Sequence, residues 1–464
     1  MKKMTVVYDD SRIPERMIRN ITGNKSFGET IFKRIPLRDR MERICMRIPV
    51  CGGFAGKGEK ITADSPDAIL KLYSDMVIRD EEAFAILAEK SLYAKECYKV
   101  VQDDKIACVI YPDAQHYLAS APTDEAGFAA IPTDAFSDLS SVGAFRQFIT
   151  DGFDARFFNE LSGDDFTVVK HSANIEKLRR EYTFYGLLPD DMKMWFAMPF
   201  SYREEDGSAS YAMERYHMTD LAIRYVHGAI GTDEFRSIME KLFHFITTRR
   251  HKTVPEDVYR KCTQELYVDK VRRRIEELKK HPACGKLNAL LASGARFADI
   301  DAVYTYYLDV YAQMTRKRKT ESVLAIGHGD LCFSNILYSD EASFIKLIDP
   351  KGAMTEEELY TDPYYDLAKL SHSILGSYDY FNSDLFEICV NEKMELQLRV
   401  DCSNEAYAAV FRDYLDRYHM DLPLIRLYEA SLFLSMLPLH IDREKKVLAF
   451  ILNAIRILEG IAHE

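Results

Sequence analysis

The sequence has few features that would cross-link it or bind a structural metal. Its nine cysteines are odd in number and scattered over 464 residues, and no two of them form a C-x-x-C pair. The usual spacing of a zinc-ribbon site is therefore excluded, and the cysteines read as reduced thiols. Reduced thiols are typical of the cytosol, so we expect a cytoplasmic protein.

Long hydrophobic runs are also absent. No window approaches 18 uninterrupted apolar residues, which is about the length that a membrane-spanning helix needs. The apolar stretch after Met1-Lys2-Lys3 is only a few residues long before it reaches Asp9, too short for the core of a secretory signal. We therefore expect neither a membrane span nor a secretory signal.

Basic residues are outnumbered by acidic ones. Lys and Arg number 61 and Asp and Glu number 73, which gives a net charge of −12. An acidic surface repels both a nucleic-acid backbone and an anionic membrane, so neither is an expected partner. With 47% hydrophobic and 29% charged residues, the composition is that of an ordinary globular protein, and the length allows two or three domains.

A glycine loop for binding phosphate is missing too. The run from Gly52 to Gly58 fails the pattern G-x-x-x-x-G-K-[ST], because Cys51 stands at the first glycine and Gly58 at the Ser or Thr. A flexible turn is predicted there instead. The segment 150–154 has one glycine, so it contains no glycine-rich phosphate clamp either.

The first part of the chain, residues 1–118, is predicted to form a small α/β domain of uncertain role. Short β-branched runs predict strands, and longer apolar and polar mixtures predict helices. The strands are expected at 4–8 and 106–110, and the helices at 67–73 and 82–87. Small residues, Pro, Thr and Asp then dominate residues 119–142, which we predict to be a linker.

The remainder is predicted to have two lobes, which gives an α+β fold class overall. Residues 143–216 are expected to form a small antiparallel sheet with one helix inserted after its third strand, ending in a hinge. Residues 217–464 are expected to be mostly helical, because apolar residues recur there at spacings of three and four. In the sheet lobe, strands are predicted at 145–149, 155–158, 166–170, 194–199 and 211–215, and the helix at 175–187.

The strongest chemical signal lies between residues 323 and 352. An apolar run at 323–326 leads into His328-Gly329-Asp330, and Asn335 follows five residues after Asp330. A second hydrophobic strand, 344–348, ends at Asp349. Phosphoryl transfer needs oxygen ligands for Mg²⁺ and an acceptor for the proton of the nucleophile, and two carboxylates with one amide supply both. The spacing Asp-x4-Asn equals that of the kinase catalytic loop.

These motifs together resemble the aminoglycoside phosphotransferase and choline kinase superfamily. The resemblance rests on His-Gly-Asp-Leu-x-x-x-Asn-Ile-Leu, on the strand that ends in Ile-Asp, and on Asp-Pro-Tyr-Tyr-Asp-Leu-Ala at 362–368. It covers the chain from about Phe145 onward. It implies a protein-kinase-like bilobal fold, ATP and Mg²⁺ as cofactors, and transfer of the γ-phosphoryl group to a hydroxyl of a small molecule.

The resemblance also assigns roles to individual residues. Asp330 would be the catalytic base, and Asn335 and Asp349 would hold the magnesium ions. Lys170, at the end of a predicted strand, occupies the position of the phosphate-binding lysine. Its ion-pair partner would be Glu181 on the following helix.

The rest of the predicted nucleotide site is less specific. Glu176 is a rival to Glu181 on the same helical segment. The stretch that includes Met213, Glu214 and Tyr216 is similar to the hinge whose backbone reads adenine, and Met213 would line that pocket.

Other polar residues have plainer interpretations. His328 is predicted to be a packed loop histidine and Asp366 a structural brace of the catalytic loop. The basic run 316–319 is predicted to be a solvated helix end. Glu356–Glu358 and Asp362 would attract a cationic acceptor, although a solvated helix start explains them more simply.

Several alternatives stay open at this stage. A sugar or sugar-like acceptor is favoured, with choline, an amino alcohol or an aminoglycoside as alternatives. A catalytically inactive nucleotide-binding pseudokinase and transfer of AMP on the same fold are the competing functions. The acceptor and the oligomeric state are not determined by the sequence.

The first domain has a fainter resemblance of its own. Residues 73–78 are similar to the metal-aspartate region of sugar nucleotidyltransferases, but the glycine-rich start of such enzymes is absent at 8–14. A degenerate, non-catalytic remnant is predicted.

Overall fold

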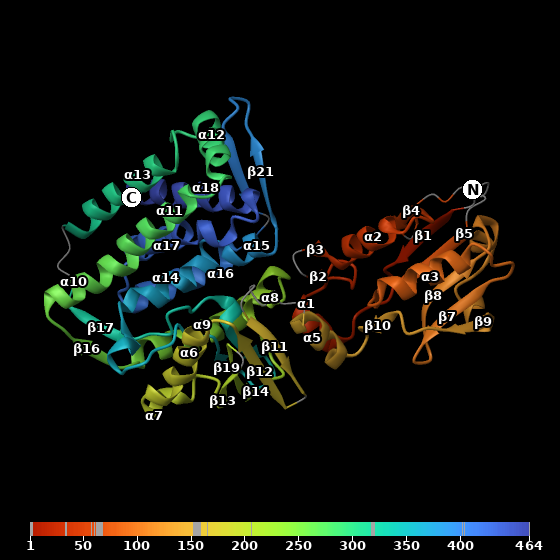
Figure 1. The fold of residues 1–464 in the computed structure, drawn as a ribbon, viewed down its shortest axis with the longest axis horizontal. Helices are drawn as coiled ribbons and strands as arrows, with labels where there is room; N and C mark the ends of the chain where they lie inside the picture. Colours follow the sequence, from red (N-terminus) through yellow and green to blue (C-terminus); the bar gives the residue numbers. More distant parts are fainter. Residues whose placement is uncertain are drawn as a thin grey trace. The chain divides into compact units, whose positions relative to one another are not determined.

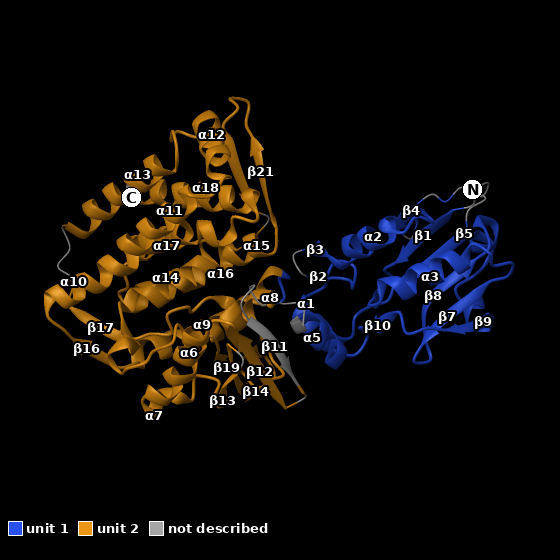
Figure 2. Cartoon of the chain, viewed as in Figure 1, with its two compact units in different colours: residues 1–154, 227–229 blue, residues 155–226, 230–464 orange. Residues whose placement is uncertain are grey.

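The chain divides into two compact units, shown in Figure 2. Unit 1 comprises Met1–Asp154 with His227–Ala229, and unit 2 comprises the rest, Ala155–Val226 and Ile230–Glu464. The computed structural model describes residues 3–32, 35–56, 58–59, 61, 68–151, 159–164, 166–205, 207–316, 321–400, 402 and 404–463.

Unit 1 is built on a mixed sheet. Among the described residues the sheet has six strands in the order β4-β1-β5-β8-β7-β9, with β1 parallel to both β4 and β5. The strands are β1 (Met4–Asp9), β4 (Cys51–Gly56), β5 (Ala68–Tyr73), β7 (Tyr98–Gln102), β8 (Lys105–Tyr111) and β9 (Ala129–Pro132). Two short pairs accompany it, β2 (Ile31–Phe32) with β3 (Ile35–Pro36), and β6 (Met76–Ile78) with β10 (Phe136–Asp138). The helices are α1 (Arg16–Thr22), α2 (Leu37–Arg47), α3 (Glu81–Ser91), α4 (Ala114–Ala119), η1 (Asp124–Gly127) and α5 (Val142–Asp151).

Two predictions for unit 1 are wrong, one made from a short apolar run and one from a glycine-rich run. The predicted helix at 67–73 is strand β5, every residue of which is buried. A strand covered on both faces has no alternation, so its sequence is hard to tell from a buried helix. The predicted turn at 52–58 is strand β4 as far as Gly56, which pairs with β1, and residue 57 lies outside the described residues.

The predicted linker at 119–142 is also wrong. This stretch contains strand β9, which pairs with β7, and strand β10, which pairs with β6. The predicted strand at 145–149 is part of helix α5, with Phe145 and Ile149 buried one turn apart. Unit 1 therefore extends to Asp154 rather than ending at 118, and the predicted strand at 155–158 lies outside the described residues.

Unit 2 begins with an antiparallel sheet in the order β11-β12-β14-β13. Its strands are β11 (Asn159–Gly163), β12 (Thr167–Ser172), β13 (Pro199–Glu205) and β14 (Ser208–Glu214). Helix α6 (Ile175–Leu187) follows β12, capped by the Asn174 side chain on the backbone N–H of Lys177. The helix is thus inserted after the second described strand instead of the third. The strand predicted at 194–199 begins only at Pro199, after α7 (Asp190–Lys193).

The rest of unit 2 is mostly helical (Figure 1), which confirms the predicted α+β order of a sheet lobe followed by a helical lobe. Its helices are α8 (Leu221–Val226), α9 (Thr232–Thr248), α10 (Glu256–Gln264), the π-helical turn η2 (Glu265–Asp269), α11 (Lys270–Lys279), α12 (Cys284–Gly294), α13 (Ile300–Arg316), η3 (Phe333–Asn335), η4 (Glu357–Leu359), α14 (Pro363–Ile374), α15 (Tyr378–Asn382), α16 (Glu405–Arg417), α17 (Leu422–Met436), η5 (Leu437–His440) and α18 (Glu444–His463).

Short strands in the helical lobe flank the loop that carries the predicted catalytic residues. One group is β16 (His251–Thr253), β17 (Val323–Ile326) and β20 (Tyr360–Thr361), and another is β15 (Thr219–Asp220), β18 (Ile336–Ser339) and β19 (Phe344–Leu347). The hairpin β21 (Phe386–Val390) and β22 (Leu396–Val400) lies farther along the chain.

Helix α17 forms the centre of the core of unit 2. With η5 it is long and apolar enough to cross a membrane by length and composition, the one such segment among the described residues. Its residues are buried by packing within unit 2, where it contacts α14, α11 and α18. That packing explains its apolar composition, because a helix surrounded by other helices is hydrophobic on every side.

Candidate active site

The loop that follows β17 presents the predicted catalytic residues. Gly329 has φ of +77°, and a Cβ atom there would lie 2.5 Å from the Cβ of Lys351, so a glycine fits this turn. The Nδ2 of Asn335 donates to the backbone carbonyl of Asp330 at 2.8 Å. This bond holds the Asn335 side chain against the backbone of Asp330 and leaves the amide oxygen of Asn335 for another ligand.

The side chain of Asp366, on α14, binds the backbone of this loop. Its carboxylate accepts from the backbone N–H groups of His328 and Gly329, each at 2.9 Å, and from Arg249 at 2.6 Å. The side chains of Arg249 and Asp366 are both 0% exposed. All of these bonds are consistent with the predicted structural role of Asp366, because a carboxylate engaged in this way is not free to bind a metal. Helix α14 itself begins with Pro363 in its first turn and the Asp362 carboxylate as its cap.

His328 links the loop to the strand end at Asp349. Its Nε2 lies 2.9 Å from the carbonyl oxygen of Ile348, and its Nδ1 accepts from the N–H of Asp330 at 3.1 Å. This pair of bonds fits a neutral ring with its proton on Nε2. The ring is buried and stacks on Phe196, and burial lowers the pKa of His328 below its usual range. His328 is therefore a packed loop residue, as predicted.

The neutral state of His328 gives a pH dependence with a definite sign. The unfolded chain takes up a proton on this histidine as the pH falls through about 6.5, whereas the folded chain resists it. The free energy of unfolding should therefore fall below pH 6.5, with His328 contributing up to about 1.4 kcal/mol per pH unit.

This contribution is separated by comparing His328→Asn with the wild type. Urea unfolding at pH 7.5 and 5.5, followed by the fluorescence of Trp195, should show a smaller loss in the variant. His372, whose pKa is also lowered by burial, contributes equally to both chains and cancels. The exposed His244 provides the control, and His244→Asn should keep the wild-type loss. An identical loss in His328→Asn and the wild type would contradict the neutral assignment.

Asp349, Lys170 and Glu181 meet at the end of β19. The Nζ of Lys170 lies 2.6 Å from Oε2 of Glu181 and 2.9 Å from Oδ1 of Asp349. The Lys170 and Glu181 side chains are buried, and the side chain of Asp349 is 41% exposed. The structure thus brings together the predicted lysine, its predicted partner and the predicted metal ligand, from three separate segments. Glu176 has no such contact among the described residues.

Electrostatics keep Lys170 and Asp349 charged, whereas burial raises the pKa of Glu181. Burial by itself would lower the pKa of Lys170, but Asp349, Tyr211 and Glu181 raise it. Surrounding protein would raise the pKa of Asp349, yet the Lys170 ammonium outweighs that effect and lowers it. A charged lysine and a charged carboxylate are therefore in place at neutral pH. Asp349 has φ of +55°, an uncommon conformation that clusters at functional sites.

The donors fit a magnesium ion bound together with phosphate. Asp349 offers a carboxylate and Asn335 an amide oxygen, the hard ligands that Mg²⁺ takes, and Mg²⁺ usually binds through one or two carboxylates plus substrate phosphates. Within the described residues, no group of three or more His, Cys, Asp or Glu side chains is placed to hold a metal.

Lys369 of α14 is a site residue that the sequence analysis missed. Its Nζ lies 2.7 Å from Oδ1 of Asp330, and its side chain is 12% exposed. Burial would lower the pKa of Lys369, but Asp330 raises it, so the ion pair is retained. The only sequence signal was its place three residues after Asp366 on the same helix, which brings it toward the same loop.

The predicted hinge residues are only partly joined to this cluster. Met213 lines a narrow cavity of about 20 Å³, which is room for about one water molecule, together with Glu181 and Asp349. Glu214 is exposed, and the pKa of Tyr216 is raised to about 12 by burial and by a hydrogen bond to Glu214. Neither Glu214 nor Tyr216 lines that cavity, so their role in binding adenine stays a prediction.

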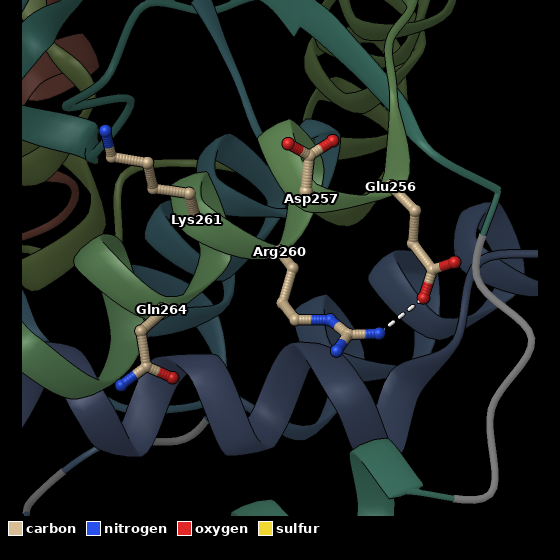
Figure 3. Close-up of a pocket in the computed structure, with 5 residues that line it drawn as sticks. All are labelled: Glu256, Asp257, Arg260, Lys261 and Gln264. Atoms are coloured by element: carbon tan, nitrogen blue, oxygen red, sulfur yellow. Dashed lines mark hydrogen bonds and ion pairs between the residues drawn. The ribbon is translucent and has the colours of Figure 1, made fainter.

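A larger depression of about 650 Å³ lies along α10 and is lined by none of these residues (Figure 3). The side chains around it project from one exposed helix, and Arg260 reaches back to Glu256 at 2.5 Å. Such i,i+4 pairs are ordinary on a solvated helix face. The lining residues are Glu256, Asp257, Arg260, Lys261 and Gln264, none of which was predicted for the site.

Asp75 of unit 1 lies in the region that resembles the metal-aspartate region, and its carboxylate forms ion pairs with two basic side chains. Its Oδ1 lies 2.7 Å from Arg12 and its Oδ2 lies 2.6 Å from Lys105. With both oxygens in ion pairs, the carboxylate is not available to a metal. This pairing supports the prediction of a non-catalytic unit, which stays a prediction.

Comparison with known proteins gave similarity to solved structures alone. No protein-family model matches the chain, and no curated protein matches it. A thermostable mutant of aminoglycoside phosphotransferase APH(4)-Ia is 11% identical, covering 69% of this chain and 100% of that one with a TM-score of 0.38. A protein described as a fructosamine-3-kinase from Haemophilus somnus 129PT is 12% identical, covering 66% and 90% with a TM-score of 0.40.

A further similar structure, aminoglycoside-3'-phosphotransferase of type VIII, is 14% identical, with coverage of 65% and 93% and a TM-score of 0.33. At these identities and TM-scores the similarity does not carry a function over to this chain. The function has to be inferred from the residues of the site itself, a buried lysine held between two carboxylates beside a catalytic loop of the Asp-x4-Asn type.

Proposed function

We propose that the chain is a phosphotransferase that moves the γ-phosphoryl group of ATP to a hydroxyl of a small metabolite. One observation carries the proposal. Lys170 contacts Glu181 and Asp349, while Asn335 is bonded to the backbone of Asp330, so four separate segments supply a cation, an amide and three carboxylates. Those are the groups that phosphoryl transfer requires.

Each residue has a distinct role in the proposal. Lys170, oriented by Glu181, would bind the phosphates. Asp349 and the amide oxygen of Asn335 would hold Mg²⁺, which when bound neutralises charge on the transferred group. Asp330 would orient the acceptor hydroxyl and take its proton. His328 and Asp366 act on the loop rather than on the substrate, because their bonds go to its backbone.

The proposal is tested by identifying what ATP becomes. The full chain is incubated with ATP, Mg²⁺ and a panel of sugars, amino alcohols and aminoglycosides, and ADP, AMP and pyrophosphate are quantified. Acceptor-dependent ADP release that chelation of Mg²⁺ abolishes is the expected result. Pyrophosphate release would replace the proposal with AMP transfer. ATP binding without turnover on any acceptor would favour a pseudokinase, and failure to bind ATP would refute the nucleotide site.

Replacing Lys170 with methionine should lower kcat about 10²- to 10³-fold, because the variant loses the preorganised cation at the phosphates. It also leaves Glu181 buried without its strongest partner. Lys177→Met is the matched control, since Lys177 approaches Glu181 at 3.6 Å but is 48% exposed. Exposed pairs contribute little, so the control should keep its rate within about twofold. Steady-state ADP release measures both variants, and equal rates in the two would contradict the role of Lys170.

A further inference from the structure

A second feature lies beside Asp330, on the side formed by α14. Lys369 is paired with Asp330 at 2.7 Å, and Tyr365 lies one turn before Lys369 on the same helix. The hydroxyl of Tyr365 accepts a hydrogen bond from Nζ of Lys270 at 2.9 Å. Two lysines therefore flank one buried tyrosine near the proposed catalytic base.

Lys270 lacks a balancing carboxylate. Among the contacts given for the described residues, it touches the hydroxyl and the ring of Tyr365 and no acidic side chain. The acidic residues just before it are paired elsewhere, Glu265 with Arg273 at 2.6 Å and Asp269 with Arg272 at 2.8 Å. Since Lys369 already balances Asp330, the ammonium of Lys270 is a surplus positive charge in a protein of net charge −12.

Lys270 also follows an irregular piece of backbone. It is the first residue of α11, directly after the π-helical turn η2. Single π-helical turns inside helices occur frequently at functional sites, where the extra residue changes the direction of the side chains that follow. The ring of Tyr267, within η2, lies 6.1 Å from the ring of Tyr365, so the turn packs against the same part of α14.

Two of the acidic residues that would attract a cationic acceptor, Glu358 and Asp362, are not available to one. Asp362 is fully buried, where its carboxylate caps α14 and accepts from Tyr259 at 3.1 Å. Glu358 pairs with Arg180 at 2.8 Å. The carboxylate of Asp330, next to which the acceptor hydroxyl would lie, is neutralised by Lys369. A cationic amine would therefore meet an excess of positive charge on this side of the site.

We propose that the acceptor carries an anionic group, a carboxylate or a phosphate ester, next to its reacting hydroxyl, and that Lys270 and Lys369 bind this group. The inference rests on the proposed kinase function and specifies its substrate class. In the reaction, the bond from the γ-phosphorus to the ADP oxygen breaks and a bond to the acceptor oxygen forms. The hydroxyl proton passes to Asp330, and ADP leaves.

The test uses matched acceptors that differ in charge alone. On triose, pentose and hexose skeletons, the neutral sugar or polyol, its amino derivative, its sugar acid and its phosphate ester are compared with the full chain, ATP and Mg²⁺. We expect kcat/KM for ADP release to be at least about tenfold higher for anionic members than for neutral ones, and lowest for amines. Comparison of sugar acids with phosphate esters identifies which anionic group is bound.

Variants of Lys270 connect the preference to the proposed residue. Lys270→Gln should raise KM for anionic acceptors about 10- to 100-fold, because charge-assisted hydrogen bonds to the anion are lost. Lys270→Glu should reverse the preference toward amine acceptors, and Lys270→Arg should retain the preference for anions. Lys261→Gln, which removes an exposed lysine of α10 (Figure 3), is the matched control and should leave KM unchanged.

The outcomes separate this inference from the kinase function. Faster turnover of neutral or amine members, or a KM that Lys270→Gln does not change, overturns the inference while Asp330-dependent ADP release keeps the kinase function. No turnover of any anionic member by a chain that binds ATP also overturns it. Loss of ATP binding removes both together.

Discussion

Replacing Asp330 with asparagine is expected to lower kcat about 10²- to 10⁴-fold, because an amide cannot take the proton of the acceptor hydroxyl. The dissociation constant of ATP should change less than about threefold, since Lys170 and Asp349 are untouched. Acceptor-dependent ADP release measures the first quantity and a binding titration with ATP measures the second. The combination of lost turnover and retained binding distinguishes a catalytic residue from a nucleotide ligand.

Two controls are needed to interpret the activity of Asp330→Asn. The substitution leaves Lys369 without its carboxylate partner, so Trp195 fluorescence must show that unit 2 unfolds at a similar urea concentration. Glu341→Gln, an exposed carboxylate in the turn between β18 and β19, should keep the wild-type rate. If Asp330→Asn retained activity within about tenfold, Asp330 would not be the base, and the proposed chemistry would need another proton acceptor.

Replacing Arg249 with methionine is expected to lower the free energy of unfolding of unit 2 by about 3–5 kcal/mol. The reason is that Asp366 would be left charged and buried without its cation, while still bonded to the backbone of His328 and Gly329. Urea unfolding followed by Trp195 reports on unit 2 specifically, because this is the single tryptophan and it lies 5.7 Å from the ring of Phe245.

The neighbouring arginine gives a matched comparison. Arg250 pairs with Asp191 at 3.2 Å, but the two side chains are 57% and 64% exposed. Arg250→Met should cost less than about 1 kcal/mol, because exposed ion pairs contribute little. A double variant, Arg249→Met with Asp366→Leu, should recover part of the loss by removing the uncompensated charge. Equal destabilisation by Arg249→Met and Arg250→Met would contradict the role assigned to the buried pair.

The catalytic loop was predictable because its information is local. The order of β17, the loop and β18 follows from two apolar runs with His328, Asp330 and Asn335 between them. The bond from Asn335 to the carbonyl of Asp330 spans five residues, so sequence spacing is enough to predict their proximity. The pairing of Lys170 with Glu181 was also predictable from the sequence, because the two residues lie on a strand and on the helix that follows it.

Predictions failed where the sequence signal was weak in itself. Strand β5 was taken for a helix because it is buried on both faces and so shows no alternation. Strands β9 and β10 were taken for a linker because small residues, Pro, Thr and Asp dominate the stretch around them, although β9 pairs with β7. Pairing with a distant strand overrides local propensity, and a single sequence does not reveal the partner.

By itself, the sequence determined the α+β class of unit 2 and the order of strand, loop and strand around residues 328–335, and it predicted the proposed base, metal ligands and phosphate-binding lysine. Three interactions were decided by the tertiary structure alone. Lys369 forms an ion pair with Asp330, and the carboxylate of Asp366 binds Arg249 and the backbone of the loop. Lys270 donates a hydrogen bond to the hydroxyl of a tyrosine. The physical reason is the range of the interactions. Spacing along the chain encodes contacts between near neighbours, whereas charge balance around a site depends on side chains that only the packing of distant helices brings together.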